Sequence, residues 1–546
     1  MLRRLILIVL LLASVRLNAQ VRVISPLPKG VLQVRGDRAL LHFRISVPQY
    51  VQNFSVSLLS DTSTLDPFVA RERATPANGW LDTVIYVPKS LRYYTLWWFA
   101  DSSGQPLQGS IPGLTPGHII GIAGQSNAQG ATWNMMETPI HDVRMLRDER
   151  LWEAAHEPTG NFSGGPWIVM ANVLDTMIHD SLPIGIVNAA WGGTGLLANP
   201  GGGLWTRNTA QPDDSSVYGN ALRRFRASGG ILECLCWIQG EAEGYQGFPS
   251  IHMYQDSFVA LVQNFRSDLG DTCPVFHLQV DGLNTPLSPI AYWMQIREAH
   301  RTLPMSTLVG TSIGRPENDL HYTYETHHIV AHMFAGALLA TQYGIISPFY
   351  PPLMPDTSAI LDSTGIGNSK YSFRLEWHRN GVPIKLFFKN SKQYFALLRD
   401  AEFLDTSKVW SQITSDSQSV LVGLRAESID PSRKWSMAYC AAADGDDAPL
   451  ATKTTTDDTI FATGFYDLPV VFPTNADMIV SDNATPQVLD ATATLFDELG
   501  ILRYEKSLRA GERLDLSRDD LRPGCYWLRL QDSVGKRMIT KLLIIR

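Results

Sequence analysis

Between about residues 117 and 344, predominantly apolar runs of strand length alternate with amphipathic segments of helix length. The apolar runs are residues 118–123, 184–189, 231–238 and 275–279, and the helical segments include residues 254–269 and 326–341. A strand without polar alternation must be covered on both faces, and strands that alternate with helices form parallel sheets. The sequence therefore predicts an α/β domain in which helices cover both faces of a parallel sheet.

The segments on either side of this domain have a different pattern. Residues 39–46, 54–59 and 93–99 alternate apolar and polar positions, and the alternation returns after residue 347. A period of two with aromatic and β-branched residues is typical of antiparallel β structure. At 546 residues the chain has room for several domains. We expect a signal peptide over 1–19, an N-terminal β-sandwich-like domain over 20–116, the α/β domain over 117–345, a β-rich accessory domain over 346–475, a linker over 476–488 and a C-terminal β domain over 489–546.

The first residues have the composition of an export signal. Arg3 and Arg4 precede an apolar run over residues 5–15, and Ala19 supplies a small residue before Gln20. This pattern predicts a secretory signal peptide that is cleaved near Ala19. Because no second apolar run is long enough to cross a bilayer, we expect an exported protein without a membrane span.

Charge and cysteine content exclude several function classes. The formal net charge is −7, and Lys and Arg form no consecutive block, so a nucleic-acid partner is not expected. The five cysteines fit no zinc or disulfide spacing, and we interpret Cys234 and Cys236 as buried neighbours on one face of a strand. His328 and His332 share a predicted helix but lack the intervening Glu of a zinc-binding helix. We interpret this pair as part of a packed helix face and expect no metal site.

Polar residues follow each apolar run at the point where a strand is expected to end. Gly124-Gln-Ser-Asn127 follows the first run, Trp191-Gly-Gly-Thr-Gly195 the second and Gln239-Gly-Glu-Ala-Glu243 the third, while Asn318-Asp-Leu-His-Tyr322 precedes the last long helix. In open α/β sheets, ligands bind beyond the carboxyl ends of the strands. We therefore expect these four segments to meet at one edge of the sheet.

The residue types in these segments suit acyl transfer. A serine hydroxyl becomes a nucleophile when a base accepts its proton, which points to Ser126 as nucleophile and His321 as base. Asp319 is the first candidate to hold the imidazole tautomer, and Glu241 and Glu243 are alternatives for this role. Taken alone, Ser126 also fits the ordinary role of a helix cap, so the hypothesis depends on the segments converging.

Attack on an ester carbonyl creates an oxyanion that needs fixed hydrogen-bond donors. The N–H groups of Ser126 and Gly193 and the side-chain amide of Gln239 are the candidate donors. The remaining polar and aromatic residues of these segments are candidates to line a substrate pocket. They are Gln125, Asn127, Trp191, Thr194, Trp205, Glu241 and Glu243.

The four segments resemble the ordered motifs of the SGNH/GDSL hydrolase superfamily. The second and third motifs are Asn188-Ala-Ala-Trp-Gly-Gly-Thr194 and Trp237-Ile-Gln-Gly-Glu241. The branch that they resemble contains sialate O-acetylesterase-like proteins and the acetylxylan esterases of carbohydrate esterase family 6. The resemblance covers about residues 117–345. It implies a flavodoxin-like fold, a serine esterase without metal or cofactor, and removal of acetyl groups from sugars.

The resemblance also implies roles for single residues. Ser126 is the nucleophile, His321 is the base with Asp319 as its partner, and Gly193 and Gln239 belong to the oxyanion hole. One departure concerns Glu243, because members of this branch often have Asp or Asn at the matching place.

The expected substrate is an O-acetylated glycan or sialic acid, with sialate esters first and acetylated xylan or another plant glycan second. The alternative from another functional class is a surface glycan-binding protein that keeps the fold without turnover.

Residues 489–546 resemble the C-terminal sorting domain of type IX secretion cargo. The similarity lies in Leu495-Phe-Asp-Glu-Leu-Gly500, Leu514-Asp-Leu516 and Gly524-Cys-Tyr-Trp-Leu528. It implies contact with a secretion machinery, export across an outer membrane, and a secreted or surface-attached product. The alternative is a β domain that only packs on the enzyme.

Overall fold

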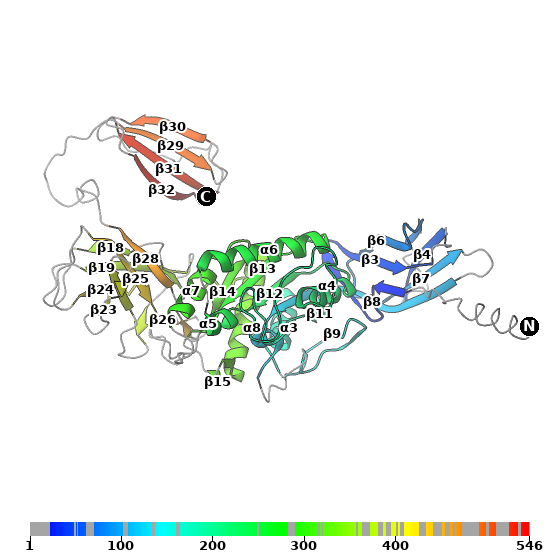
Figure 1. Ribbon diagram of the computed structural model, residues 1–546. Coiled ribbons are helices and arrows are strands. Elements are labelled where there is room, and N and C mark those ends of the chain that lie inside the picture. Colours follow the sequence, from blue (N-terminus) through cyan, green and yellow to red (C-terminus); the bar gives the residue numbers. More distant parts are fainter. Residues whose placement is uncertain are drawn as a thin grey trace, which may run out of the picture. The chain divides into compact units, whose positions relative to one another are not determined.

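Figure 1 shows the computed structural model of the chain. The chain divides into two compact units, Met1–Val471 and Phe472–Arg546. The structure describes residues 22–48, 51, 53–61, 70–101, 107–132, 137–159, 164–247, 250–281, 290–313, 317–318, 320–355, 359–362, 372–379, 386–388, 395–399, 402–403, 409–415, 417–424, 433–439, 450–453, 459–461, 465–471, 491–497, 502–508, 524–532 and 537–544. The expected signal peptide and linker lie outside the described residues.

The first strands form a mostly antiparallel β structure around an apolar core. They are β1 (Arg22–Ser25), β2 (Val31–Arg35), β3 (Arg38–Ser46), β4 (Asn53–Ser60), β5 (Ala70–Ala74), β6 (Trp80–Pro88), β7 (Tyr94–Asp101) and β8 (Leu107–Gly124). β3 pairs with β1, β2 and β6, whereas β4 pairs with β5 and β7. Alternate residues of β3 are buried, as its sequence pattern predicts. In the core, the ring centroids of Phe43 and Trp98 lie 5.9 and 5.7 Å from that of Phe54.

Strand β8 runs without a break through the domain boundary that the sequence predicts at residue 116. Up to Leu114 it pairs with β7, and from Thr115 onward it pairs with β2 and then with strands of the parallel sheet. Pro112 and Pro116 therefore mark the place where β8 changes partners and do not end the β structure. A proline removes one ladder donor but is compatible with an extended backbone. One strand thus connects the N-terminal core to the central sheet.

The central sheet is parallel, which confirms the predicted fold class. Besides β8, it contains β9 (Val143–Arg147), β11 (Ile184–Asn188), β12 (Cys234–Ile238), β13 (Val275–Gln279) and β14 (Thr307–Thr311), with β10 (Leu151–Ala154) antiparallel at the edge. The order is β10-β9-β11-β8-β12-β13-β14. Every residue of β11, β12 and β13 is buried. Cys234 and Cys236 are buried free thiols with sulfurs 3.9 Å apart, which confirms that they are neighbours on one strand.

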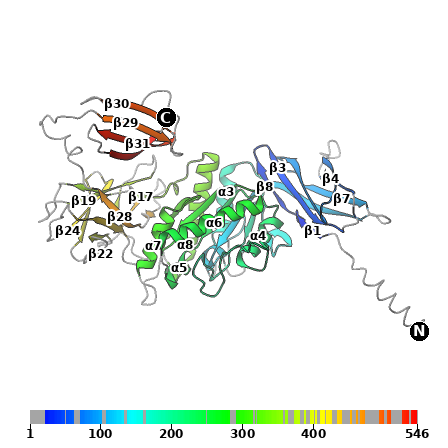
Figure 2. The same ribbon diagram turned by 45° about the horizontal axis from the view of Figure 1, so that its top comes forward.

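Helices cover both faces of this sheet (Figures 1 and 2). One layer contains α3 (Trp167–Ile178) and α8 (Tyr324–Leu338), which contact each other, and α8 continues into the π-helix η1 (Leu339–Tyr343). The other layer contains α4 (Val217–Ala227), α6 (Ile251–Leu269) and α7 (Ile290–Arg301). Two short helices, α2 (Ser126–Gln129) and α5 (Glu241–Gln246), begin just after β8 and β12 end.

The predicted β-rich regions follow. In residues 346–471 the described strands are β17 (Met354–Pro355), β18 (Ala359–Asp362), β19 (Ser372–His378), β20 (Phe387–Phe388), β21 (Phe395–Arg399), β22 (Glu402–Phe403), β23 (Val409–Ile413), β24 (Ser419–Leu424), β25 (Trp435–Tyr439), β26 (Leu450–Lys453), β27 (Thr459–Phe461) and β28 (Phe465–Val471). The second unit contains β29 (Ala491–Asp497), β30 (Leu502–Leu508), β31 (Gly524–Asp532) and β32 (Arg537–Ile544), antiparallel in the order β30-β29-β31-β32. Among the described residues, no helix has both the length and the apolar character needed to cross a membrane.

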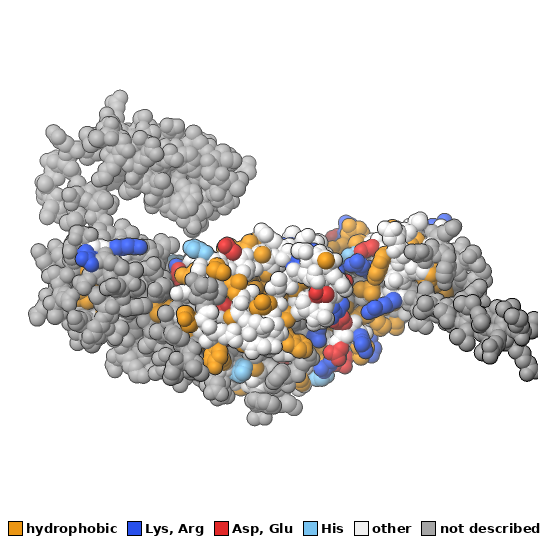
Figure 3. Space-filling model, viewed as in Figure 1, with side chains coloured by type: hydrophobic (Ala, Val, Ile, Leu, Met, Phe, Trp, Pro, Cys, Tyr) orange, Lys and Arg blue, Asp and Glu red, His pale blue; other side chains and the backbone are white. Residues whose placement is uncertain are grey.

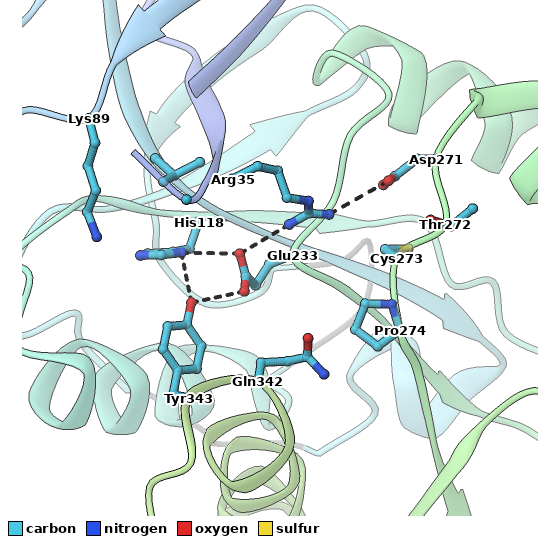
Figure 4. Close-up of a pocket in the computed structure, with 12 residues that line it drawn as sticks. Arg35, Lys89, His118, Glu233, Asp271, Thr272, Cys273, Pro274, Gln342 and Tyr343 are labelled. Carbon is cyan, nitrogen blue, oxygen red and sulfur yellow. Dashed lines mark hydrogen bonds and ion pairs between the residues drawn. The ribbon is translucent and has the colours of Figure 1, made fainter. Parts of the chain in front are cut away.

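A buried polar cluster lies where β8 passes from the N-terminal core into the parallel sheet (Figure 4). His118 of β8 contacts Asp180 at 3.0 Å and Glu233 at 3.2 Å. Tyr343 of η1 donates to Glu233 at 2.9 Å, and Arg35 of β2 forms an ion pair with Glu233 at 3.5 Å. Burial disfavours the charged imidazole, but the hydrogen bonds to both carboxylates raise the pKa of His118 to about 9. The cluster lines a cavity of about 420 Å³ at the amino ends of the parallel strands, opposite the edge predicted for the site.

Candidate active site

Ser126 lies just beyond the carboxyl end of β8, at the first residue of α2. The chain leaves the strand at Gly124, whose φ of 128° favours glycine. A side chain there would also collide with β12, because a Cβ on Gly124 would lie 2.1 Å from the carbonyl oxygen of Ile238. The N–H of Gln125 donates to that same oxygen at 3.0 Å. This turn holds Ser126 at the sheet edge between β8 and β12.

His321 reaches Ser126 from a distant part of the chain. It begins β16 (His321–Tyr322), which pairs with β15 (Glu317–Asn318) just before α8. Its Nε2 atom lies 3.1 Å from Ser126 Oγ, within the reach of a general base. The structure thus brings together the two side chains that the sequence pairs across 195 positions.

Three acidic residues are candidates to hydrogen-bond the imidazole of His321. Asp319 lies outside the described residues, so its role stays a prediction. The two alternatives are engaged elsewhere, because Glu241 accepts from Asn127 at 2.7 Å and Glu243 accepts from backbone N–H groups of residues 196–198. In the described part of the chain, neither glutamate makes a hydrogen bond to His321. The geometry therefore gives no support to Glu241 or Glu243 as the partner.

Asn127 ties the helix of Ser126 to the segment of His321. Its Nδ2 atom donates to Glu241 at 2.7 Å and to the carbonyl oxygen of Leu320 at 3.0 Å. Its Oδ1 atom accepts from the N–H of Tyr322 at 3.1 Å. These two backbone contacts flank the histidine and fix its distance from the serine. Asn127 is fully buried and does not line the pocket, contrary to the prediction.

The turn after β11 packs against the nucleophile. The N–H of Gly192 donates to Gln129 Oε1 at 2.9 Å, and a Cβ on Gly192 would lie 3.8 Å from Ser126 Cβ. Gly193 has a φ of 68°, in the left-handed region that favours glycine. Its N–H makes no hydrogen bond within the described part of the chain, and a helix leaves its first N–H groups without helical partners. The N–H groups of Ser126 and Gly193 are therefore available to a negatively charged oxygen.

Two glutamines lie beside this turn. The buried amide of Gln239 donates to Gln125 Oε1 at 3.1 Å and to Glu243, and its oxygen accepts from Tyr254 at 2.9 Å. Neither N–H of Gln239 is left for an oxyanion in this arrangement, so the predicted donor role is not supported. Gln125 lines the pocket, and its oxygen also accepts from the N–H of Ala242 at 3.2 Å. Because its oxygen is held by two donors, its amide nitrogen is the end left for a ligand.

A pocket of about 620 Å³ opens over the serine and the histidine. Its lining residues are Gln125, Ser126, Gln129, Ala131, Trp191, Gly192, Gly193, Pro200, Glu241, Ala242, Tyr245, Leu320 and His321. Of the candidates from the sequence, Gln125, Trp191 and Glu241 therefore line it, and the Trp191 side chain is 47% exposed. Tyr245 was missed, although its position two residues after Glu243 in the third segment is a signal that could have found it.

Three other candidates lie behind the pocket wall, contrary to the prediction. Thr194, Glu243 and Trp205 are buried and are not among the lining residues. Thr194 Oγ1 donates to the carbonyl oxygen of Trp191 at 2.7 Å and accepts from Trp205 Nε1 at 3.0 Å. These side chains hold the turn from behind.

Glu241 brings a carboxyl group to the pocket wall. One oxygen accepts from Asn127, and the other has no hydrogen-bond partner in the described part of the chain. Burial raises the pKa of Glu241 to about 7, opposed by the hydrogen bond from Asn127 and assisted by the nearby charge of Glu243. Glu241 therefore changes protonation near neutral pH.

A family model described as carbohydrate esterase, sialic acid-specific acetylesterase, matches residues 116–340. The matched stretch contains the parallel sheet, Ser126 and His321. No curated protein matches the chain.

Several solved structures are similar to parts of the chain. A protein from Arabidopsis thaliana is 25% identical, with 41% of this chain and 99% of that chain covered and a TM-score of 0.34. A family two carbohydrate esterase from Cellvibrio japonicus is 15% identical, with 59% and 97% covered and a TM-score of 0.27. An active-site mutant of a family two carbohydrate esterase from Clostridium thermocellum is 14% identical, with 60% and 99% covered and a TM-score of 0.27. TM-scores this low do not support a conclusion about this chain. The family match over residues 116–340 is the informative comparison. Residues 116–340, which place a serine and a histidine at the carboxyl edge of a parallel sheet, are therefore similar to carbohydrate esterases of the sialic acid-specific acetylesterase family.

Proposed function

We propose that this protein is a carbohydrate O-acetylesterase in which Ser126 is the nucleophile. The observation that carries the proposal is the 3.1 Å contact between Ser126 Oγ and His321 Nε2 in the wall of one pocket. The family match over residues 116–340 supports a carbohydrate ester as the substrate.

In the first half-reaction, His321 Nε2 accepts the proton of Ser126 while Oγ attacks the acetyl carbonyl carbon. The carbonyl oxygen becomes an oxyanion that the N–H groups of Ser126 and Gly193 stabilise, together with the amide of Gln125. When the intermediate collapses, the bond from the acetyl carbon to the sugar oxygen breaks. His321 then donates its proton to the departing sugar hydroxyl, and Ser126 carries the acetyl group.

In the second half-reaction, a water molecule gives a proton to His321 and attacks the acetylated Ser126. The same donors stabilise the second oxyanion, acetate leaves, and the serine regains its proton. Asp319, two residues before the histidine, orients the imidazole and stabilises its charged form.

O-acetylated sialic acid is the first candidate substrate, and acetylated xylan or another plant glycan is the second. Trp191 and Tyr245, which are 47% and 37% exposed, give the pocket a partly apolar wall suited to the apolar face of a sugar ring. A volume of about 620 Å³ is ordinary for a small-molecule site. The description of the family model as sialic acid-specific favours the sialate ester.

We also propose that the protein is exported. The basic and apolar pattern of residues 1–19 and the resemblance of residues 489–546 to a sorting domain support export to the cell surface or beyond. Sequencing the amino terminus of the mature protein is expected to find Gln20. Deleting residues 489–546 is expected to retain the protein inside the outer membrane, and unchanged secretion would contradict the sorting role.

The test of the function is acetate release from O-acetylated sialic acid and from acetylated xylan. The wild-type protein is expected to act on the sialate ester with the higher kcat/KM, and Ser126→Ala is expected to lose this activity by several orders of magnitude. A higher kcat/KM with acetylated xylan would change the proposed substrate but not the proposed esterase activity. No acetate release from either glycan, or equal release by Ser126→Ala, would favour the glycan-binding alternative.

A further inference from the structure

Glu243 lies behind the pocket with its carboxylate surrounded by donors. Oε1 accepts from the backbone N–H groups of Leu196, Leu197 and Ala198 at 2.7, 3.0 and 3.4 Å, and Oε2 accepts from the amide of Gln239. The side chain is fully buried. Because both oxygens face donors, the ionised carboxylate, which only accepts hydrogen bonds, satisfies all of these contacts.

The three backbone donors belong to the loop that also carries Gly193. Successive N–H groups that converge on one oxygen form an anion-binding nest. The loop closes tightly around the carboxylate, since a Cβ on Gly195 would lie 2.8 Å from Glu243 Oε1 and 1.8 Å from the carbonyl oxygen of Ala198. The backbone path of this loop therefore depends on the carboxylate it encloses.

The other end of the same loop is anchored to residues on either side of the nucleophile. Gly192 donates to Gln129 of α2 at 2.9 Å, and Trp191 donates to the carbonyl oxygen of Gly124 at 3.1 Å. Gly193, which carries the candidate oxyanion donor, lies between these contacts and the nest. Beyond Gly193 the loop is also held by the N–H of Gly202, which donates to the carbonyl oxygen of Gly193 at 2.8 Å. Loss of the Glu243 anchor would remove the three contacts of the nest from this side and leave the N–H of Gly193 less firmly positioned.

We propose that Glu243 is a positioning residue of the oxyanion hole: its carboxylate fixes the 191–198 loop and thereby aims the N–H of Gly193 at the reacting carbonyl oxygen. This inference rests on the proposed esterase function. The side chain spans from α5 to the loop after β11, and the shorter Asp would hold its carboxylate farther from the donors of the nest. Burial raises the pKa of Glu243 above its ordinary value, although the hydrogen bonds from Leu197 and Gln239 oppose this effect.

The isosteric variant Glu243→Gln tests the proposal, because an amide nitrogen would replace one acceptor and face a donor. With p-nitrophenyl acetate, kcat is expected to fall roughly 10- to 100-fold, since a misplacement near 1 Å costs about this much, while KM stays within about threefold. The inhibition constant of an alkylboronic acid, which forms a tetrahedral adduct on Ser126, is expected to rise in the same proportion. Glu376→Gln, the same change at an exposed position of β19, is the matched control and is expected to keep wild-type values.

A purely structural role would lower the folded fraction but leave the boronic acid constant of the folded molecules unchanged. That result, or a wild-type kcat in folded Glu243→Gln, would overturn the proposal. Glu243→Asp is the second variant and is expected to give an intermediate kcat, because it keeps the charge at a shorter reach. Failure of both variants to fold would also overturn the proposal in favour of a structural role. A wild-type activity that Ser126→Ala does not reduce would instead overturn the esterase function itself.

Discussion

Glu241 and Glu243 are two residues apart on α5, yet their environments differ. Glu243 faces several donors, whereas Glu241 has one hydrogen bond from Asn127 and one oxygen without a partner in the described part of the chain. Desolvation disfavours a charge that is not compensated, so burial raises the pKa of Glu241 to about 7. The number of hydrogen-bond donors around each carboxyl group therefore distinguishes Glu243, which anchors a loop, from Glu241, which lines the pocket.

The raised pKa of Glu241 predicts a pH dependence of stability. A carboxyl group whose pKa is higher in the folded chain stabilises the fold fully below its unfolded pKa, and this contribution is lost as the pH rises through the folded value. The wild-type free energy of unfolding is therefore expected to fall, relative to Glu241→Gln, by up to about 3 kcal/mol between pH 4.5 and pH 7. Urea unfolding of both proteins across this range measures the difference. Parallel curves would show that Glu241 does not titrate in this window.

The loop after β11 is the element that connects the fold to the chemistry. Two of its glycines are required for different reasons, because Gly193 needs a positive φ and Gly195 needs space. A Cβ on Gly193 would make only ordinary contacts with Gly202, at 3.5 and 3.7 Å. A Cβ on Gly195 would overlap the backbone of Ala198.

This difference predicts an order of stability for two alanine variants. Gly193→Ala is expected to cost about 1–2 kcal/mol of unfolding free energy, from the left-handed backbone alone. Gly195→Ala is expected to cost at least about 3 kcal/mol, at the upper end of overpacking effects, because the backbone itself must move. Denaturant unfolding of the two variants gives the comparison, and equal stabilities would contradict the loop geometry.

The strands of the parallel sheet were predicted well because burial on both faces makes their sequences uniformly apolar. The prediction over 275–279 coincides with β13, and that over 184–189 extends one residue beyond β11. The sequence pattern does not predict the hairpin of β9 and β10. It also predicts a domain boundary at Pro116, within the continuous strand β8. Prolines often mark turns, but β8 continues through Pro116, because it pairs with β7 before this residue and with β2 around it.

The loops that carry the site were also predictable, since strand ends place them at one edge. The direction of each side chain within those loops was not. Gln239, Thr194 and Asn127 all follow buried strands, yet their polar atoms bond to other protein groups and these residues do not line the pocket. Whether a polar residue faces a cavity or its wall depends on partners from distant segments, such as Tyr254 for Gln239.

At the scale of the whole molecule, the N-terminal β structure is joined to the central sheet by backbone and by charge. Strand β8 belongs to both, and the cluster around His118 lies at the junction. Arg35, from the N-terminal strands, forms an ion pair with Glu233, which directly precedes β12. Figure 3 shows charged side chains on the viewed surface of the described part of the chain. His118 and Glu233 are instead buried, so their pairing is protected from screening by water and salt.

The charge on His118 predicts how this junction responds to alkaline pH. Its folded pKa of about 9 lies above the unfolded value of 6.5, so its contribution is complete below pH 6.5 and is lost as the pH rises through 9. The wild-type free energy of unfolding is expected to fall by about 3 kcal/mol more than that of His118→Gln over this interval. Thermal and urea unfolding at a series of pH values measures this difference. An equal alkaline decline in both proteins would show that His118 is not charged in the fold.

Activation of Ser126 by His321 is measured by the rate and position of labelling with a fluorophosphonate. Peptide mass spectrometry is expected to find a single adduct on Ser126 in the wild-type protein. The labelling rate is expected to fall at least about 100-fold in His321→Ala, as for loss of a general base. An adduct on another residue, or the same rate in His321→Ala, would show that His321 does not activate Ser126.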